Sequence, residues 1–291
     1  MGTASFLDVL QAERPVQVVG TVDAYTAMLA ADAGFRALYL SGSGVATSSH
    51  GLPDLGLTTL SEVAEDVRRI GGATDLPLLV DADTGWGPPL MVERAVRVLE
   101  RAGASAVQLE DQSIEKRCGH RPNKRVVAAD VMEERVRAAV NARRDPSLAI
   151  VARTDALAVT GLDDALERTA RYVRAGADII FVEAATSLDH YAAAREAAGV
   201  PILANLTEFG VTPLFGLADL RAAGVSYALY PLSAFRAMSR AATQVFEAIR
   251  RDGTQAAVID TMQTRTELYR VLDYEVYERR MDEVPVEVDR T

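Results

Sequence analysis

Short apolar runs recur along the chain, separated by Ala-, Arg- and Glu-rich segments with helical spacing. This alternation is typical of repeated strand–helix units that build a parallel sheet. We expect strands at Val16–Val19, Ala37–Leu40, Leu76–Val80, Ala106–Leu109, Ala149–Ala152, Ile179–Val182, Ile202–Ala204 and Tyr227–Tyr230. Eight strands with their helices predict an α/β fold, a (β/α)8 TIM-type barrel. An open doubly wound sheet normally has fewer strands and a G-x-G-x-x-G turn after the first one, which this chain lacks.

Glycine marks the end of three predicted helices. Met91–Ala102, Asp163–Ala175 and Ala218–Ala223 are each followed by a glycine, which closes a helix by adopting the left-handed conformation. Asp163 is expected to cap the start of its helix. After the last strand, Ser233–Arg251 is expected to form the eighth helix of the barrel.

The chain continues beyond that eighth helix. Further helices are predicted at Thr254–Val271 and Tyr274–Met281, followed by an acidic tail at Asp282–Thr291. These helices carry apolar residues that a closed barrel has no room for, so we expect them to pack on a neighbouring subunit. No linker, repeat or low-complexity stretch indicates a second domain. We therefore expect a single domain over residues 1–291, with a helical extension at about 254–281.

Composition and charge narrow the class of protein. Apolar residues make up 49% and charged residues 25% of the chain, as in an ordinary globular protein. A single cysteine excludes an intrachain disulfide. No apolar stretch reaches the ~20 residues of a membrane helix and no N-terminal signal pattern is present, so we expect a cytoplasmic protein without a membrane partner. The net charge of −10 argues against nucleic acid as a partner but permits an anionic substrate beside local cations.

Carboxylates follow the predicted strands, at the end where such a barrel holds its active site. Asp81 and Asp83 follow the third strand two positions apart, so both face the same side of an extended chain. With Glu110 and Glu183, which follow the fourth and sixth strands, they form an oxygen-rich site that suits Mg2+. The absence of a histidine pair at helical spacing argues against zinc. The alternative is that the two aspartates only cap a helix or accept hydrogen bonds from loop amides.

The segment Lys116-Arg117-Cys118-Gly119-His120 contains the single cysteine of the chain. Neighbouring cations lower the pKa of a thiol, so we expect Cys118 to be a reactive thiolate on an accessible loop. The alternative is a buried cysteine that acts as a small apolar residue. That alternative is disfavoured because no apolar residue adjoins Cys118.

Arginine and small polar residues follow other strands. The forked donors of Arg153, Arg236 and Arg265 suit carboxylates, although any one such arginine is more often the partner in a surface ion pair. Neutral hydrogen bonds are available from Ser41, Ser43, Asn205 and Thr207. With a metal, these groups indicate a substrate with two or three carboxylates, on which the metal neutralises an oxyanion as it forms.

Six motifs carry a family resemblance: Tyr39-Leu40-Ser41-Gly42-Ser43-Gly44-Val45-Ala46, Asp81-Ala82-Asp83-Thr84-Gly85-Trp86-Gly87, Lys116-Arg117-Cys118-Gly119-His120-Arg121-Pro122-Asn123-Lys124, Ala152-Arg153-Thr154-Asp155-Ala156, Asn205-Leu206-Thr207-Glu208-Phe209-Gly210 and Tyr230-Pro231-Leu232-Ser233-Ala234-Phe235-Arg236. From about Phe6 to Met281 the chain resembles the isocitrate lyase and phosphoenolpyruvate mutase superfamily, and within it the branch that cleaves 2-methylisocitrate. The resemblance implies a homotetramer whose subunits exchange the eighth barrel helix. It also implies a lyase that cleaves 2-methylisocitrate to pyruvate and succinate, in the methylcitrate cycle of propionate catabolism, with Mg2+ or alternatively Mn2+.

The resemblance also assigns roles residue by residue. Asp81 and Asp83 would bind the metal, and Cys118 would be the acid that protonates the succinate carbanion. The base that takes the substrate hydroxyl proton stays open among Tyr39, Glu110 and His120. The substrate would contact Ser41, Gly42, Ser43, Cys118, Gly119, Arg153, Glu183, Asn205, Leu206, Thr207, Arg236 and Arg265. One departure is visible, since close relatives carry Ser-Gly-Gly-Gly where this chain has Ser41-Gly42-Ser43-Gly44.

Rival functions differ in substrate or in class. Isocitrate lyases act on a substrate without the extra methyl group, a difference worth ~1–3 kcal/mol in an apolar pocket. This chain lacks their large insertions, and Phe181 and Leu229 resemble the residues that make room for the methyl group. Dimethylmalate lyase and oxaloacetate hydrolase are further alternatives, although the branches that act as decarboxylases tend to lack the cysteine loop. A catalytically silent dicarboxylate-binding barrel is the non-enzyme alternative, which the presence of Cys118, Asp81 and Asp83 disfavours.

Overall fold

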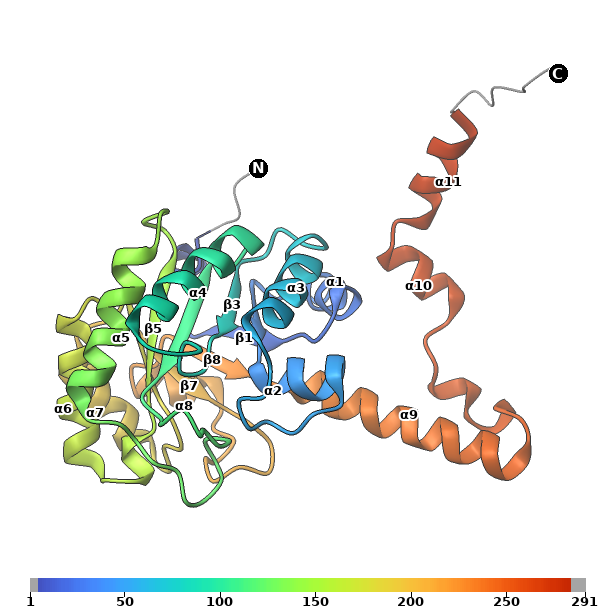
Figure 1. Cartoon of the computed structure of the whole chain (residues 1–291). Coiled ribbons are helices and arrows are strands. Elements are labelled where there is room, and N and C mark those ends of the chain that lie inside the picture. The colour runs from blue at the N-terminus through green and yellow to red at the C-terminus, as the bar shows by residue number, and fades with distance from the viewer. Residues whose placement is uncertain (1–4, 284–291) are drawn as a thin grey trace. The chain divides into compact units, whose positions relative to one another are not determined.

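The computed structural model describes residues 5–283, and its eight parallel strands close into a barrel in chain order (Figure 1). Each strand pairs with the next, and β1 pairs with β8 to close the ring. The strands are β1 Val16–Gly20, β2 Ala37–Leu40, β3 Leu78–Asp81, β4 Ala106–Glu110, β5 Ala149–Thr154, β6 Ile179–Val182, β7 Ile202–Asn205 and β8 Tyr227–Tyr230. The predicted (β/α)8 barrel is confirmed.

The start of β3 is the one place where a predicted strand begins too early. Leu76 and Pro77 precede the strand, which begins at Leu78 and pairs there with Leu38. Pro77 has no amide N–H to give to a ladder, and it contributes only its carbonyl, which accepts from the Leu38 N–H at 3.0 Å.

Helices follow the strands and cover the outside of the barrel (Figure 1). They are α1 Ala24–Asp32, α2 Gly42–Gly44, α3 Leu60–Gly71, α4 Pro89–Ala102, α5 Ala129–Ala142, α6 Leu162–Arg174, α7 Leu188–Ala198 and α8 Leu217–Ala222. Short helices of other types lie at Asp8–Gln11, Val45–Ser49 and Ala156–Ala158.

Glycines end three of these helices as predicted. Gly103, Gly176 and Gly224 follow α4, α6 and α8 with φ of 115°, 107° and 79°, in the left-handed region that glycine adopts without a steric penalty. The predicted cap of α6 is wrong, because Gly161 occupies that position and Asp163 lies inside the first turn. There its charge faces the positive end of the helix dipole.

Two apolar layers explain why the strands are apolar on both faces. Alternate residues such as Tyr39, Phe181 and Leu229 fill the barrel interior, whereas residues such as Leu38 and Val80 pack against the surrounding helices. The inner layer leaves the carboxyl ends of the strands to polar side chains.

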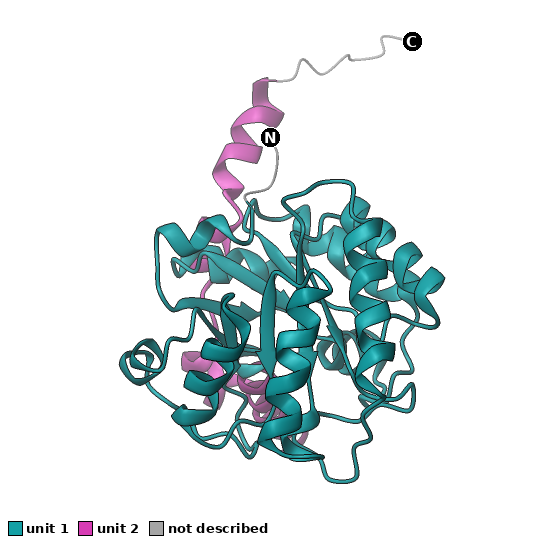
Figure 2. Cartoon of the chain, turned by 90° about the vertical axis from the view of Figure 1, so that its left-hand side faces the viewer, with its two compact units in different colours: residues 1–235 teal, residues 236–291 magenta. Residues whose placement is uncertain are grey.

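The chain divides into two compact units, the first ending at Phe235 and the second starting at Arg236 (Figure 2). The boundary falls in the first turn of α9 Ser233–Asp252, and the bounds of this helix confirm the one predicted at Ser233–Arg251. The second unit continues with a 3-10 helix at Ala256–Thr261, α10 Arg265–Val271 and α11 Tyr274–Glu283. Whether the chain forms one domain stays a prediction.

The predicted continuous helix at Thr254–Val271 is wrong. Thr264 accepts from the Glu267 N–H, and the Glu267 side chain accepts from the Thr264 N–H, so a capping box starts a new helix at Arg265. The predicted tail at Asp282–Thr291 also starts too early, because α11 extends to Glu283. The rest of the predicted tail, residues 284–291, lies outside the described residues. Over residues 5–283, no helix combines the length and apolar character needed to cross a membrane.

Candidate active site

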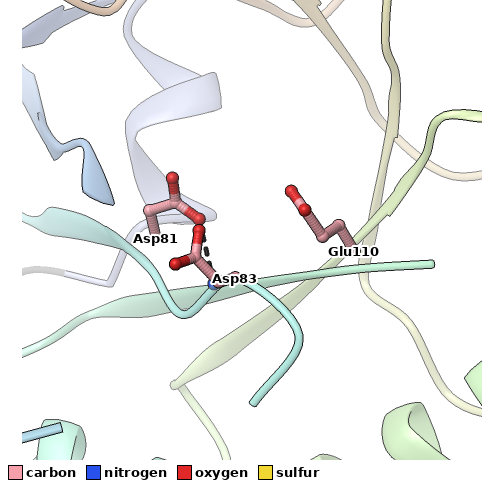
Figure 3. A group of neighbouring side chains, drawn as sticks. All are labelled: Asp81, Asp83 and Glu110. Atoms are coloured by element: carbon pink, nitrogen blue, oxygen red, sulfur yellow. Dashed lines mark hydrogen bonds between the residues drawn. The ribbon is translucent and has the colours of Figure 1, made fainter. Parts of the chain in front are cut away.

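Three carboxylates meet at the carboxyl ends of β3 and β4. Asp81 ends β3, Asp83 follows two residues later, and Glu110 ends β4. One oxygen from each lies within 4.8 Å of the others, and Figure 3 shows the three side chains rising from the same edge of the sheet. The Glu110 N–H donates to the Asp83 carbonyl at 2.9 Å, which ties the two strand ends together. The predicted pairing of Asp81 with Asp83 is observed, and Glu110 joins it.

Asp81 is held by four donors. Its Oδ1 accepts from Gln108 Nε2 at 3.0 Å and from the Asp83 N–H at 3.1 Å. Its Oδ2 accepts from the Gly42 N–H at 3.1 Å and from the Tyr39 hydroxyl at 3.2 Å. A carboxylate has about four lone-pair positions, so the orientation of Asp81 is fixed by its surroundings.

Lys116 lies between two carboxylates beside this group. Its Nζ is 2.5 Å from Asp83 Oδ1 and 2.6 Å from an oxygen of Asp54. Burial raises the pKa of Asp83 to about 7, against the opposing effect of the Lys116 charge. Burial alone would lower the pKa of Lys116, but Asp83 and Glu110 outweigh it and raise that pKa well above its usual value.

The three carboxylates fit a divalent cation. Glu110 Oε1 is buried and has no hydrogen-bond partner among the described residues. Burial raises the pKa of Glu110 well above its usual value, because Arg153 compensates only part of the cost. Hard cations such as Mg2+ prefer oxygen ligands, and a cation at this position would satisfy the free oxygen and offset the repulsion among the carboxylates.

Arg153, on β5, connects this group to a second one. Its Nε and Nη2 donate to the two oxygens of Asp155 at 2.9 and 3.1 Å. Its Nη1 lies 3.4 Å from Glu110 Oε2 and 3.4 Å from Glu183 Oε2. The guanidinium also lies over the Phe181 ring, 5.2 Å from its centroid. The positive charge of Arg153 therefore offsets the negative charges of three carboxylates, Asp155, Glu110 and Glu183.

Glu183 is not part of the acidic cluster, which corrects the expectation that it would join the metal site. Its Oε1 lies 2.8 Å from His120 Nε2, and Asn205 Nδ2 donates to both of its oxygens at 3.3 and 3.2 Å. Burial alone would raise the pKa of Glu183, but Arg153 and His120 outweigh it and hold that pKa well below its usual value. Glu183 is thus an anion that organises neighbouring donors.

The ring of His120 has a defined orientation. The Val211 N–H donates to Nδ1 at 3.1 Å, so that nitrogen carries the lone pair. The proton is therefore assigned to Nε2, which faces Glu183. In this arrangement neither ring nitrogen has a lone pair free to accept a further proton.

Cys118 is exposed on its loop, but the prediction of a thiolate is wrong. Partial burial raises the pKa of the thiol, helped by the charges of Asp54 and Glu183 and opposed by the His120 N–H and Arg153. The sequence pattern did not show this burial, and Lys116, counted there as a neighbouring cation, pairs with Asp54 and Asp83. The protonated form is favoured, which is the form a proton donor needs.

The remaining predicted substrate contacts divide into two groups. Ser41, Gly42, Leu206 and Gly119 are buried in the first unit, and Ser43 and Thr207 are half-buried there. A Cβ added to Gly42 would lie 3.2 Å from Asp83 Oδ1, which shows how closely the turn approaches the carboxylates. Phe181 and Leu229 lie in the inner apolar layer. Arg236 and Arg265 belong to the second unit, and their role stays a prediction.

Some residues of this region had no role assigned from sequence. Gln108 was expected only as part of a strand, and Asp54 lies in a loop without a distinctive pattern. Asp155 and Lys124 lie within two of the motifs quoted above. The motifs indicate that the two residues are near the site, but not that they contact each other. The structure joins them by a 2.6 Å contact between Lys124 Nζ and Asp155 Oδ1.

Comparisons with known proteins agree with this architecture. The family model described as phosphoenolpyruvate phosphomutase matches residues 6–250. A 2-methylisocitrate lyase of Escherichia coli (strain K12) is 55% identical over 279 residues, covering 96% of this chain and 94% of the relative.

Solved structures agree as well. The crystal structure of a 2,3-dimethylmalate lyase, described as a PEP mutase/isocitrate lyase superfamily member, has a TM-score of 0.87 and 33% identity over 97% of this chain and 95% of that one. A phosphonopyruvate hydrolase solved with oxalate and Mg++ has a TM-score of 0.82 and 28% identity, over 94% of this chain and 95% of that one. These similarities support an enzyme of the lyase class. The chain belongs to the phosphoenolpyruvate phosphomutase family, within the isocitrate lyase superfamily.

Proposed function

We propose that this protein is a magnesium-dependent carbon–carbon lyase that cleaves 2-methylisocitrate to pyruvate and succinate, as in the methylcitrate cycle. The observation that carries the proposal is the buried cluster of Asp81, Asp83 and Glu110, which the loop carrying Cys118 reaches through Lys116. The 55% identity to a 2-methylisocitrate lyase supports this substrate over the alternatives.

Asp81, Asp83 and Glu110 would hold the metal. Their all-oxygen donor set suits Mg2+, with Mn2+ as an alternative. The Mg++ in the related phosphonopyruvate hydrolase supports the same assignment. Because four donors already surround Asp81, its contact to a cation would run through water, whereas Glu110 offers a free oxygen. When bound, the cation supplies a positive charge near the substrate oxygens.

The carboxylates of the substrate would face the polar groups around the mouth. Arg153 Nη1 lies 3.4 Å from both Glu110 and Glu183, which is long for a hydrogen bond. A substrate carboxylate could therefore accept a hydrogen bond from this nitrogen. The other proposed contacts are Ser41, Gly42, Ser43, Gly119, Glu183, Asn205, Leu206, Thr207, Arg236 and Arg265.

Glu110 is the base that the geometry favours among three candidates. Tyr39 donates its hydroxyl proton to Asp81, and burial with the Asp81 charge raises its pKa well above the usual value. Both nitrogens of His120 are engaged. If Glu110 Oε1 faces the cation, the substrate hydroxyl proton would pass to Oε2, which lies 3.4 Å from Arg153 Nη1.

Cys118 would complete the reaction as the acid. After Glu110 takes the hydroxyl proton, the carbon–carbon bond breaks, its electron pair stays on the succinate carbon, and the other fragment becomes pyruvate. The Cys118 thiol gives its proton to that carbon. Proton exchange with solvent then returns the Glu110 carboxylate and the thiol to their starting forms.

A side-by-side steady-state assay tests this proposal. 2-Methylisocitrate, isocitrate and 2,3-dimethylmalate are compared at one Mg2+ concentration, and pyruvate, glyoxylate and succinate are measured. We expect kcat/KM for 2-methylisocitrate to exceed the others by about tenfold or more, since one methyl group is worth ~1–3 kcal/mol. A preference for either rival would refute the substrate, and no activity on any of them would refute the lyase mechanism.

The second unit suggests how the subunits assemble. Met238, Phe246, Ile249, Ile259, Tyr277 and Met281 expose large apolar side chains there. Such an apolar surface suits contact with another copy of the chain. We propose a homotetramer in which α9 is exchanged between subunits. Light scattering at micromolar concentration would measure the mass of the assembly and show whether it contains four chains.

A further inference from the structure

The Cys118 loop is a closed structure of its own. Gln112 and Val126 form an isolated antiparallel bridge at its base, and the Ser113 N–H donates to the Arg125 carbonyl at 2.9 Å. Within the loop, Gln112 Nε2 donates to the Arg117 carbonyl at 2.9 Å. These contacts define the shape of the loop, but they do not attach its tip to the barrel.

Lys124 makes that attachment. Its Nζ lies 2.5 Å from the Gly119 carbonyl, next to Cys118, and 2.6 Å from Asp155 Oδ1. Its side chain is 3% exposed and that of Asp155 is 0% exposed. Asp155 directly follows β5, so this buried ammonium is one link between the loop tip and the barrel.

The tip approaches the barrel as closely as a glycine permits. A Cβ added to Gly119 would lie 2.4 Å from Arg153 Nη2 and 2.5 Å from Glu183 Cγ. Two other groups of the loop reach the barrel, Lys116 and His120, and both contact residues assigned above to the metal or the substrate. Lys124 instead pairs with Asp155, whose two oxygens also accept from Arg153.

We propose that Lys124 is a positioning residue that latches the Cys118 loop to the barrel through Gly119 and Asp155. A buried ammonium is stable only when acceptors take its protons, and two acceptors from different parts of the chain take them here. The latch therefore holds the thiol at the mouth. Its catalytic meaning rests on the proposed function, in which Cys118 is the acid.

Lys124→Met tests the latch, with Arg125→Met as the matched control. Arg125 lies in the same loop, but its side chain pairs with the exposed Glu115 and both are about 70% exposed. Lys124→Met leaves Asp155 paired with Arg153, so we expect the barrel to fold. Thermal melting of both variants checks this.

Two readouts follow the loop without substrate. Cys118 is the only cysteine, so the rate of alkylation by iodoacetamide reports on this position alone. Tryptic cleavage after the exposed Arg117, scored by mass, reports on loop opening. We expect both rates to rise about tenfold or more in Lys124→Met, the scale of a lost charged hydrogen bond, and to stay unchanged in Arg125→Met.

Wild-type rates of alkylation and cleavage in Lys124→Met would overturn the latch. If that variant does not fold, Lys124→Arg replaces it, because arginine keeps a cation of different shape. In Lys124→Arg we expect the rates of alkylation and cleavage to rise less, about threefold. Rates equal to those of the wild type would again overturn the proposal. In an active enzyme, Lys124→Met should lower kcat more than it changes KM, and Lys124→Arg should restore part of kcat. An inactive wild type would refute the proposed function while the loop rates still decide the latch.

Discussion

Gln108 Nε2 donates to Asp81 Oδ1 at 3.0 Å, from the strand beside the one that Asp81 ends. The Tyr39 hydroxyl lies 3.3 Å from the Gln108 side-chain oxygen and 3.2 Å from Asp81 Oδ2, so the amide and the carboxylate share its one proton. A buried carboxylate that is oriented in this way presents a fixed geometry to a cation. The glutamine therefore belongs to the supporting structure of the proposed metal site.

Gln108→Leu should weaken Mg2+ binding. The substitution removes one donor from Asp81 and one acceptor from Tyr39, and such outer partners typically contribute about 10- to 100-fold in metal affinity. Calorimetric titration with Mg2+ measures the effect. Gln17→Leu, on the outer face of β1, is the control and should bind as wild type does. Equal affinity in Gln108→Leu would show that the amide does not support the site.

Removal of the metal should abolish activity. Dialysis against EDTA would remove the cation from Asp81, Asp83 and Glu110, and added Mg2+ should restore turnover. Mn2+ should also restore it, because it accepts the same oxygen ligands. Turnover of 2-methylisocitrate that persists after chelation would exclude the metal from the mechanism.

Cys118→Ser should retain substrate affinity and lose turnover. A hydroxyl is a far weaker acid than a thiol, and general acid catalysis typically contributes ~100- to 10,000-fold. We expect kcat to fall at least ~100-fold with little change in KM. A kcat near that of the wild type would remove Cys118 from the acid role.

Glu110→Gln should show whether Glu110, rather than Tyr39, is the general base. The amide keeps the size of the side chain but cannot accept the hydroxyl proton, so we expect kcat to fall at least ~100-fold at saturating Mg2+. Tyr39→Phe is the comparison. It should cost less, because it removes a hydrogen bond to Asp81 and no proton acceptor. The opposite order of effects would assign the base to Tyr39.

Alkylation of Cys118 should require alkaline pH. Partial burial and nearby carboxylates raise its pKa above the ordinary value of 9.0, so the thiol stays protonated at neutral pH. The rate of alkylation should therefore increase with pH, with a midpoint above 9.0. A midpoint well below this value would restore the interpretation as a thiolate.

Glu183 should make the protein sensitive to acid. Its pKa is lowered in the folded state by Arg153 and His120, which outweigh burial. A lowered pKa gives stability that is present above the unfolded value of ~4.3 and is lost as pH falls below it. Glu183→Gln should make the acid side of a profile of unfolding free energy against pH shallower, by up to ~1.4 kcal/mol per pH unit; urea unfolding at each pH measures that free energy. Glu167→Gln, which changes an exposed residue, should not.

The fold could be predicted because its signals are local. Each strand from β1 to β8 shows as a short apolar run, and the glycines after α4, α6 and α8 mark helix ends without reference to distant residues. The errors also have local causes. Pro77 shortens β3, and the Thr264–Glu267 capping box divides a helix that apolar spacing alone predicted as continuous.

The sequence by itself determined the barrel, the rim on which the polar residues lie and the pairing of Asp81 with Asp83. Only the tertiary structure decided which charges meet. Lys116 pairs with Asp54 and Asp83, burial raises the pKa of Cys118, and Glu183 joins His120 instead of the acidic cluster. The physical reason is that ion pairing and pKa depend on distance and burial between segments far apart in the chain, and neither quantity is encoded in local spacing.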